Sequence, residues 1–152
     1  MRRVRAGELI AGAAGVVLLA SLFLDWYSVS SRDDTLTGWA AFSFVDILLA
    51  LIALLGIALA LSEVVGRGPA LPVGLGVVTT TLALAGSLLV LYRILNQPGP
   101  NEAIGVSIGA WIGLVACAGV FFGAWLSLSD ERPRPADPVP PVPERRPTPA
   151  RS

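Results

Sequence analysis

The sequence contains no histidine, a single cysteine and few charged residues. Histidine is the usual general base and the commonest metal ligand in proteins. Elsewhere the sequence has no metal-ligand cluster, no phosphate-binding glycine loop and no nucleophile with a suitable base. Cys117 has no second cysteine with which to form an internal disulfide. We therefore expect a protein that is not an enzyme and that binds no cofactor, metal or nucleic acid.

Charged residues make up 14% of the chain, against about 25% in soluble domains. Hydrophobic residues make up 54%. They gather in four nearly uncharged stretches, at about residues 6–24, 42–62, 70–92 and 103–128. Each stretch approaches the roughly 20 residues that cross a hydrocarbon core of about 30 Å, and backbone groups in lipid must be bonded within such a segment. The sequence predicts an all-α membrane protein, a four-helix up-down bundle over residues 1–129.

All basic residues are arginines, and only Arg32 and Arg93 fall on the side of the bundle that lacks the termini. Positive charge gathers on the cytoplasmic side of membrane proteins. We therefore expect a multi-pass protein of the bacterial plasma membrane with cytoplasmic N- and C-termini.

Ionisable side chains fall near the ends of the predicted spans rather than at their centres, as Glu8 and Asp46 do. Ser43 and Asp46 have the spacing of a helix capping box, so Asp46 need not be a buried functional charge. Charges at mid-membrane mark proton relays and transporters, and this sequence predicts none there.

The last 23 residues, 130–152, are rich in proline and charge. Proline at this density favours an extended, disordered tail. Within it, Pro140, Pro143 and Arg145 match a ligand pattern for SH3-like grooves, which suggests a cytoplasmic partner. A solvated, flexible end is the simpler alternative.

Glycines recur at intervals of four in the last predicted span. Residues four apart share one helix face, and a face of glycines lets another helix approach closely. The partner helix is either one of the same bundle or one from a second copy or another membrane protein. The predicted packing residues are Gly105, Gly109, Gly113, Gly119 and Gly123.

Other polar and aromatic residues lie near the outer ends of the spans. Trp26, Tyr27 and Trp39 are expected to anchor the membrane interface, with a ligand pocket in the outer loop as the alternative. Asp25 ends the first span, where the helix dipole disfavours an anion, so we predict an ion pair with Arg93 at the corresponding end of the third, with Arg32 as the competing partner.

Thr79, Thr80 and Thr81 in the third span either line a conduction path or bond back to the preceding helical turn. Three consecutive helical residues point about 100° apart, so they cannot all face one pore. Bonding to the preceding turn is therefore the favoured interpretation.

Residues 23–27, 37–39 and 46–49 resemble a group of uncharacterised small four-span membrane proteins of high-GC actinobacteria. The resemblance covers the four spans but not the tail, and it implies no catalytic or ligand residues. The use of arginine without lysine is typical of such genomes.

We interpret the chain as a scaffold or accessory subunit that associates through its transmembrane helices. Alternatives are a small channel or transporter component and a membrane sensor with a ligand-binding outer loop. A centre packed with leucine, alanine and glycine favours the scaffold, whereas a hydrated path past the three threonines favours transport.

Overall fold

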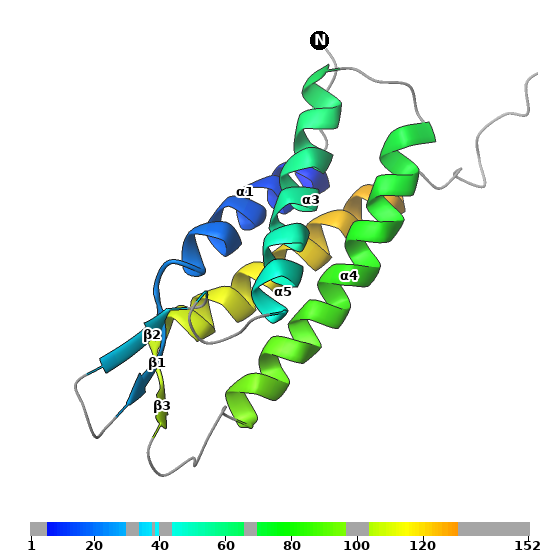
Figure 1. The fold of residues 1–152 in the computed structure, drawn as a ribbon. Coiled ribbons are helices and arrows are strands. Elements are labelled where there is room, and N and C mark those ends of the chain that lie inside the picture. Colours follow the sequence, from blue (N-terminus) through cyan, green and yellow to red (C-terminus); the bar gives the residue numbers. More distant parts are fainter. Residues whose placement is uncertain are drawn as a thin grey trace, which may run out of the picture.

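The computed structural model describes residues 6–29, 34–37, 39, 44–65, 70–96 and 104–130. These residues form four helices and three short strands (Figure 1). The helices are α1 (Ala6–Ser21), α3 (Val45–Val65), α4 (Ala70–Leu95) and α5 (Ile108–Asp130). The strands are β1 (Asp25–Val29), β2 (Asp34–Thr37) and β3 (Ile104–Val106). The predicted proline-rich tail and the capping residue Ser43 lie outside the described residues.

The helices pack side by side, and the strands lie at one end of them (Figure 1). Helix α1 lies between α3 and α5, and α4 packs on α5 and α3. The sheet is found where α1 ends and α5 begins, and the start of α1 lies at the opposite end. The first and last helices of the chain are therefore direct neighbours along their length.

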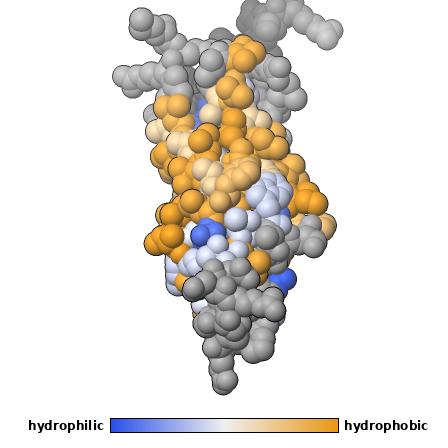
Figure 2. Space-filling model, turned by 60° about the vertical axis from the view of Figure 1, so that its left-hand side comes forward, coloured by the Kyte–Doolittle hydropathy of each residue, from blue (hydrophilic) through white to orange (hydrophobic). Residues whose placement is uncertain are grey.

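Three of the described helices are long and apolar enough to cross a membrane: α3, α4 and α5. Helix α1 is apolar too, but its 16 residues rise only about 24 Å. On the face that Figure 2 shows, hydrophobic residues cover the middle of the molecule, and more hydrophilic ones lie toward the end with the sheet. The hydrophobic stretches that the sequence revealed are thus helical, with the first one shorter than predicted.

The sheet corrects the prediction of an all-α fold. Its strand order is β2-β1-β3, and both pairings are antiparallel. Helix α1 ends at Ser21 in a turn, where the Leu24 amide donates to the Ser21 carbonyl, rather than continuing to residue 24. Helix α5 begins at Ile108 rather than at residue 103. Pairing as strands satisfies backbone groups that two separate loops would otherwise leave to water.

The main core is a continuous apolar cluster to which β1 and all four helices contribute. It includes two aromatic rings of β1 together with leucine, isoleucine and valine side chains from the helices. Its largest fully buried members are Trp26, Tyr27, Leu18, Leu22, Leu49, Ile52, Val90 and Val120. A smaller cluster of Ala11, Leu59 and Ala124 lies apart from it. The interior is therefore filled by side chains from every helix.

Candidate functional site

The glycines of α5 bring its backbone into contact with α1. A β-carbon at Gly123 would collide with the Ala11 amide nitrogen and stand 2.6 Å from the Gly7 carbonyl oxygen. A β-carbon at Gly7 would in turn stand 2.6 Å from the Ser127 nitrogen. Side chains at these positions would force the helices apart, so only glycine permits this spacing.

The same face of α5 continues toward the sheet. A β-carbon at Gly109 would lie 2.5 Å from the Asp25 carbonyl oxygen, and one at Gly113 would lie 2.5 Å from the Trp26 ring. Further along the helix, one at Gly119 would lie 2.9 Å from the Ala14 β-carbon. These contacts occur within one molecule, as in the first of the two alternatives left open by the sequence.

Gly105 does not share this helical face. It lies in β3, opposite Ser28 of β1, and a β-carbon there would stand 2.9 Å from the Ser28 Oγ. The four-residue spacing that joined it to Gly109 is therefore not a helical spacing. The described part of α5 keeps four of the five predicted packing glycines.

Glycines of α1 and α3 make further close contacts that the sequence analysis missed. On α1, a β-carbon at Gly12 would lie 2.5 Å from that of Ala60, and one at Gly15 would lie 2.6 Å from the Ala53 carbonyl oxygen. On α3, one at Gly56 would lie 2.7 Å from the Ala11 carbonyl oxygen. The small residues Gly7, Ala11 and Gly15, also four apart, were the available signal.

Trp26 and Tyr27 are not surface rings, which corrects their assignment as interfacial anchors. Both are 0% exposed. The Trp26 indole donates to the Ser21 carbonyl at 2.7 Å, and the Tyr27 hydroxyl donates to the Arg93 carbonyl at 3.2 Å. Trp39 remains exposed, with its ring centroid 6.0 Å from that of Phe23. Since two of the three rings fill the core, they do not line an open pocket.

Arg93 lies close to Tyr27 at the sheet end of α4. Burial raises the pKa of the Tyr27 phenol, and the positive charge of Arg93 partly opposes this rise. Asp25 stands in β1, two residues from Tyr27. An ion pair between Asp25 and Arg93 stays a prediction.

Two acidic side chains near helix starts are buried, which their place in the sequence did not reveal. Glu8 is 0% exposed and Asp46 is 2% exposed. Ser127 Oγ donates to Glu8 Oε1 at 3.0 Å, whereas Glu8 Oε2 and Asp46 Oδ1 are buried without a hydrogen-bond partner. Both residues stand in the first turns of helices, near the ends of the predicted spans.

The threonines of α4 bond within their own helix, in agreement with the favoured interpretation. Thr79 donates to the Leu75 carbonyl at 2.7 Å, and Thr80 and Thr81 likewise donate to carbonyls four residues earlier. Ser87 does the same. Each of these hydroxyls therefore has a hydrogen-bond acceptor in its own helix and does not need water in a channel to accept its hydrogen bond.

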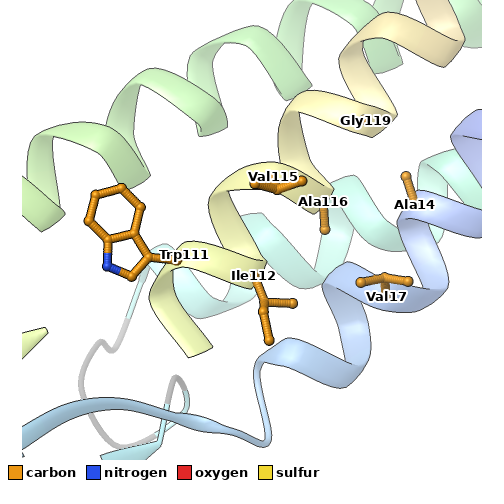
Figure 3. Close-up of a pocket in the computed structure, with 7 residues that line it drawn as sticks. All are labelled: Ala14, Val17, Trp111, Ile112, Val115, Ala116 and Gly119. Carbon is orange, nitrogen blue, oxygen red and sulfur yellow. The ribbon is translucent and has the colours of Figure 1, made fainter. Parts of the chain in front are cut away.

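An open apolar groove of about 470 Å³ lies between α1 and α5 (Figure 3). Its walls come from these two helices, and small residues form part of its surface. Val115 stands at the surface and is 71% exposed. The lining residues are Ala14, Val17, Trp111, Ile112, Val115, Ala116 and Gly119.

In the part of the chain that the structure describes, no three acidic or cysteine side chains gather as a metal-binding group. Cys117 is a buried free thiol there. Neither a family model, nor a curated protein, nor a solved structure matches the chain.

Proposed function

We propose that this protein is a scaffold or accessory subunit of the bacterial plasma membrane. In this proposal α1, α3, α4 and α5 cross the bilayer as an up-down bundle with both termini in the cytoplasm, and the sheet lies on the outer side. Three long apolar helices support the membrane location, as do large hydrophobic side chains on the surface. Examples are Leu88, Phe122 and Trp125, which are all more than half exposed. Such a surface is stable in lipid and costly in water.

The observation that carries the proposal is the filled interior. Leu18, Leu49, Ile52 and Val120 are 0% exposed, and glycines at the α1–α5 contact stand against backbone atoms of the opposite helix. A conduction path needs open space or water between the helices. The described residues instead fill the region between the helices with packed apolar side chains. Dense packing of this kind suits a rigid part that holds other proteins in place.

Replacing the threonines tests the competing channel hypothesis. We expect a Thr79→Val, Thr80→Val, Thr81→Val variant to fold and to hold its partners as the natural protein does, because each hydroxyl bonds only to its own helix and valine has nearly the same shape. Ion flux into proteoliposomes should be at background with either protein. Flux above background that the triple variant abolishes would favour a channel instead.

The groove between α1 and α5 is open to the surface. A partner helix can therefore reach this part of the contact between the two helices. Ala14, Ala116 and Gly119 line it, and small residues allow the backbone of a second helix to approach closely. Gly109, Gly113 and Gly123 are buried inside the molecule and cannot serve this purpose. We assign the groove to a transmembrane helix of a partner protein.

Filling the groove tests this assignment. A Val115→Trp substitution places a large ring over the groove without entering the core, since Val115 is 71% exposed. Val77→Trp on α4, where the side chain is 50% exposed, is the matched control. We expect in-membrane crosslinking and affinity purification to recover about tenfold less partner with V115W, equivalent to about 1.4 kcal/mol of binding free energy, and an unchanged amount with V77W.

Equal recovery by the two variants would contradict the assignment of the groove. Recovery of lipid alone, with no protein crosslinked to the natural chain, would contradict the scaffold function as well. Deleting residues 131–152 in parallel separates the two candidate contacts. A partner lost only on deletion is held by the tail, and one lost only in V115W is held by the groove.

A further inference from the structure

The carboxyl group of Glu8 is buried at the end of the molecule opposite the sheet. It lies in the first turn of α1 and is 0% exposed. Its Oε1 accepts a hydrogen bond from Ser127 Oγ at 3.0 Å, and its Oε2 has no hydrogen-bond partner. An ionised carboxylate needs hydrogen-bond donors at both oxygens or a neighbouring cation. This site supplies one neutral donor.

The surroundings of Glu8 offer little compensation for a negative charge. One turn further into the molecule stands the apolar cluster of Ala11, Leu59 and Ala124. On α5, Asp130 is a second acid, exposed at the end of the helix. On α3, the Ser62 hydroxyl is already bonded to the Leu59 carbonyl.

The described residues include no basic side chain at this end of the molecule. Within the described part of the chain the one arginine is Arg93, which lies at the sheet end of α4. In the sequence, Arg2, Arg3 and Arg5 precede α1, Arg67 falls between α3 and α4, and Arg132 follows α5. Glu63 belongs to the last turn of α3. None of these side chains is among those described. The described environment therefore favours an uncharged Glu8.

We propose that Glu8 is a proton-binding site at the contact between α1 and α5, and that loss of this proton weakens the contact. A neutral carboxyl leaves one hydroxyl unpaired, whereas an ionised carboxyl leaves an unpaired charge in an apolar site, which costs far more. Water cannot reach that charge while the helix backbones touch at Gly7 and Gly123. Ionisation is therefore linked to separation of the helices.

The first experiment measures whether the Glu8 carboxyl carries a proton. Dicyclohexylcarbodiimide, an apolar reagent, reacts with protonated carboxyls in apolar surroundings, and mass spectrometry locates the modified residue. With the full-length protein in lipid nanodiscs, we expect about tenfold more labelling of Glu8 at about pH 6 than at about pH 10, a range that includes values documented for buried glutamates. Asp46 serves as an internal comparison in the same digest.

The consequence for the helix contact is measured second. A folded form that binds the proton more tightly than the unfolded form is stabilised at low pH, and it loses that stability as the pH rises. We expect the natural protein to unfold at lower denaturant concentration at about pH 10 than at about pH 6. Glu8→Gln keeps an uncharged acceptor for Ser127 and should reduce this dependence. Asp46→Asn, which removes the other buried acid, should leave it in place.

Two results would overturn the proposal. Absence of labelling at Glu8 throughout the pH range shows a carboxylate that is ionised and paired, for instance with an arginine of the preceding segment. Equal pH dependence of unfolding in the natural protein and in E8Q shows that the proton on Glu8 has no influence on the contact. The Asp46→Asn variant identifies the other acid as the source if it alone flattens the profile.

Discussion

Replacing Gly123 by leucine is expected to disrupt the structure more than any other single glycine substitution in α5. A side chain there meets the backbone of α1 at Ala11 and Gly7, and a helix backbone cannot move aside as a flexible side chain can. We expect the free energy of unfolding to fall by about 3 kcal/mol or more, at the upper end of the cost of overpacking a core. Circular dichroism during denaturant titration in nanodiscs measures this change.

Gly74 on α4 provides the control for that experiment. A β-carbon at Gly74 has no atom within 4 Å, so Gly74→Ala introduces no clash. Alanine is the better helix former, and the free energy of unfolding should rise by about 0.5–1 kcal/mol. If Gly123→Leu were tolerated as well as Gly74→Ala, the close α1–α5 contact would be wrong.

Replacing Trp26 by alanine is expected to cost about 3–5 kcal/mol of unfolding free energy, the usual loss for a fully buried aromatic ring. The ring fills the space left by Gly113, and its indole nitrogen bonds the Ser21 carbonyl where α1 ends. Its removal therefore leaves a cavity and takes one of two hydrogen bonds from the Ser21 carbonyl, which keeps the bond from the Leu24 amide. Thermal unfolding followed by circular dichroism reports the loss.

Trp111 is the matched control, since its ring is 48% exposed on α5. Trp111→Ala should change the free energy of unfolding by less than about 1 kcal/mol. An interfacial role for Trp26 would give the two variants similar, small effects. The difference between them therefore decides whether Trp26 is a core residue or an anchor.

The helices could be predicted from the sequence because hydrophobic runs of this length have few structural alternatives. The sheet could not be predicted in this way. Its strands hold only three to five residues, and β1 and β3 lie in loops that are far apart in the sequence. Such strands form through pairing between distant segments, as between Tyr27 and Val106, and single-sequence patterns carry no signal for this pairing. For the same reason Trp26 and Tyr27 were predicted to lie at the membrane interface, whereas the structure buries both rings in the core.

The packing surface could be predicted in part. Spacing identified the glycines of α5 but not what they contact, since any helix with small residues fits such a face. Position along a helix also did not reveal that Glu8 and Asp46 are buried, although both stand in first turns. Burial near a helix end depends on how far the neighbours extend, and this is a property of the assembled structure.

The contact between α1 and α5 has a consequence for how the protein folds while it is being synthesised. The ribosome makes α1 before α5, so the glycine face that fits α1 emerges after the other three described helices. Until then Gly7, Gly12 and Gly15 have at most α3 to cover them, and Glu8 has no hydroxyl partner from Ser127. Folding is completed by a long-range contact between α1 and α5, so a nascent chain that stops before α5 leaves α1 without its closest neighbour.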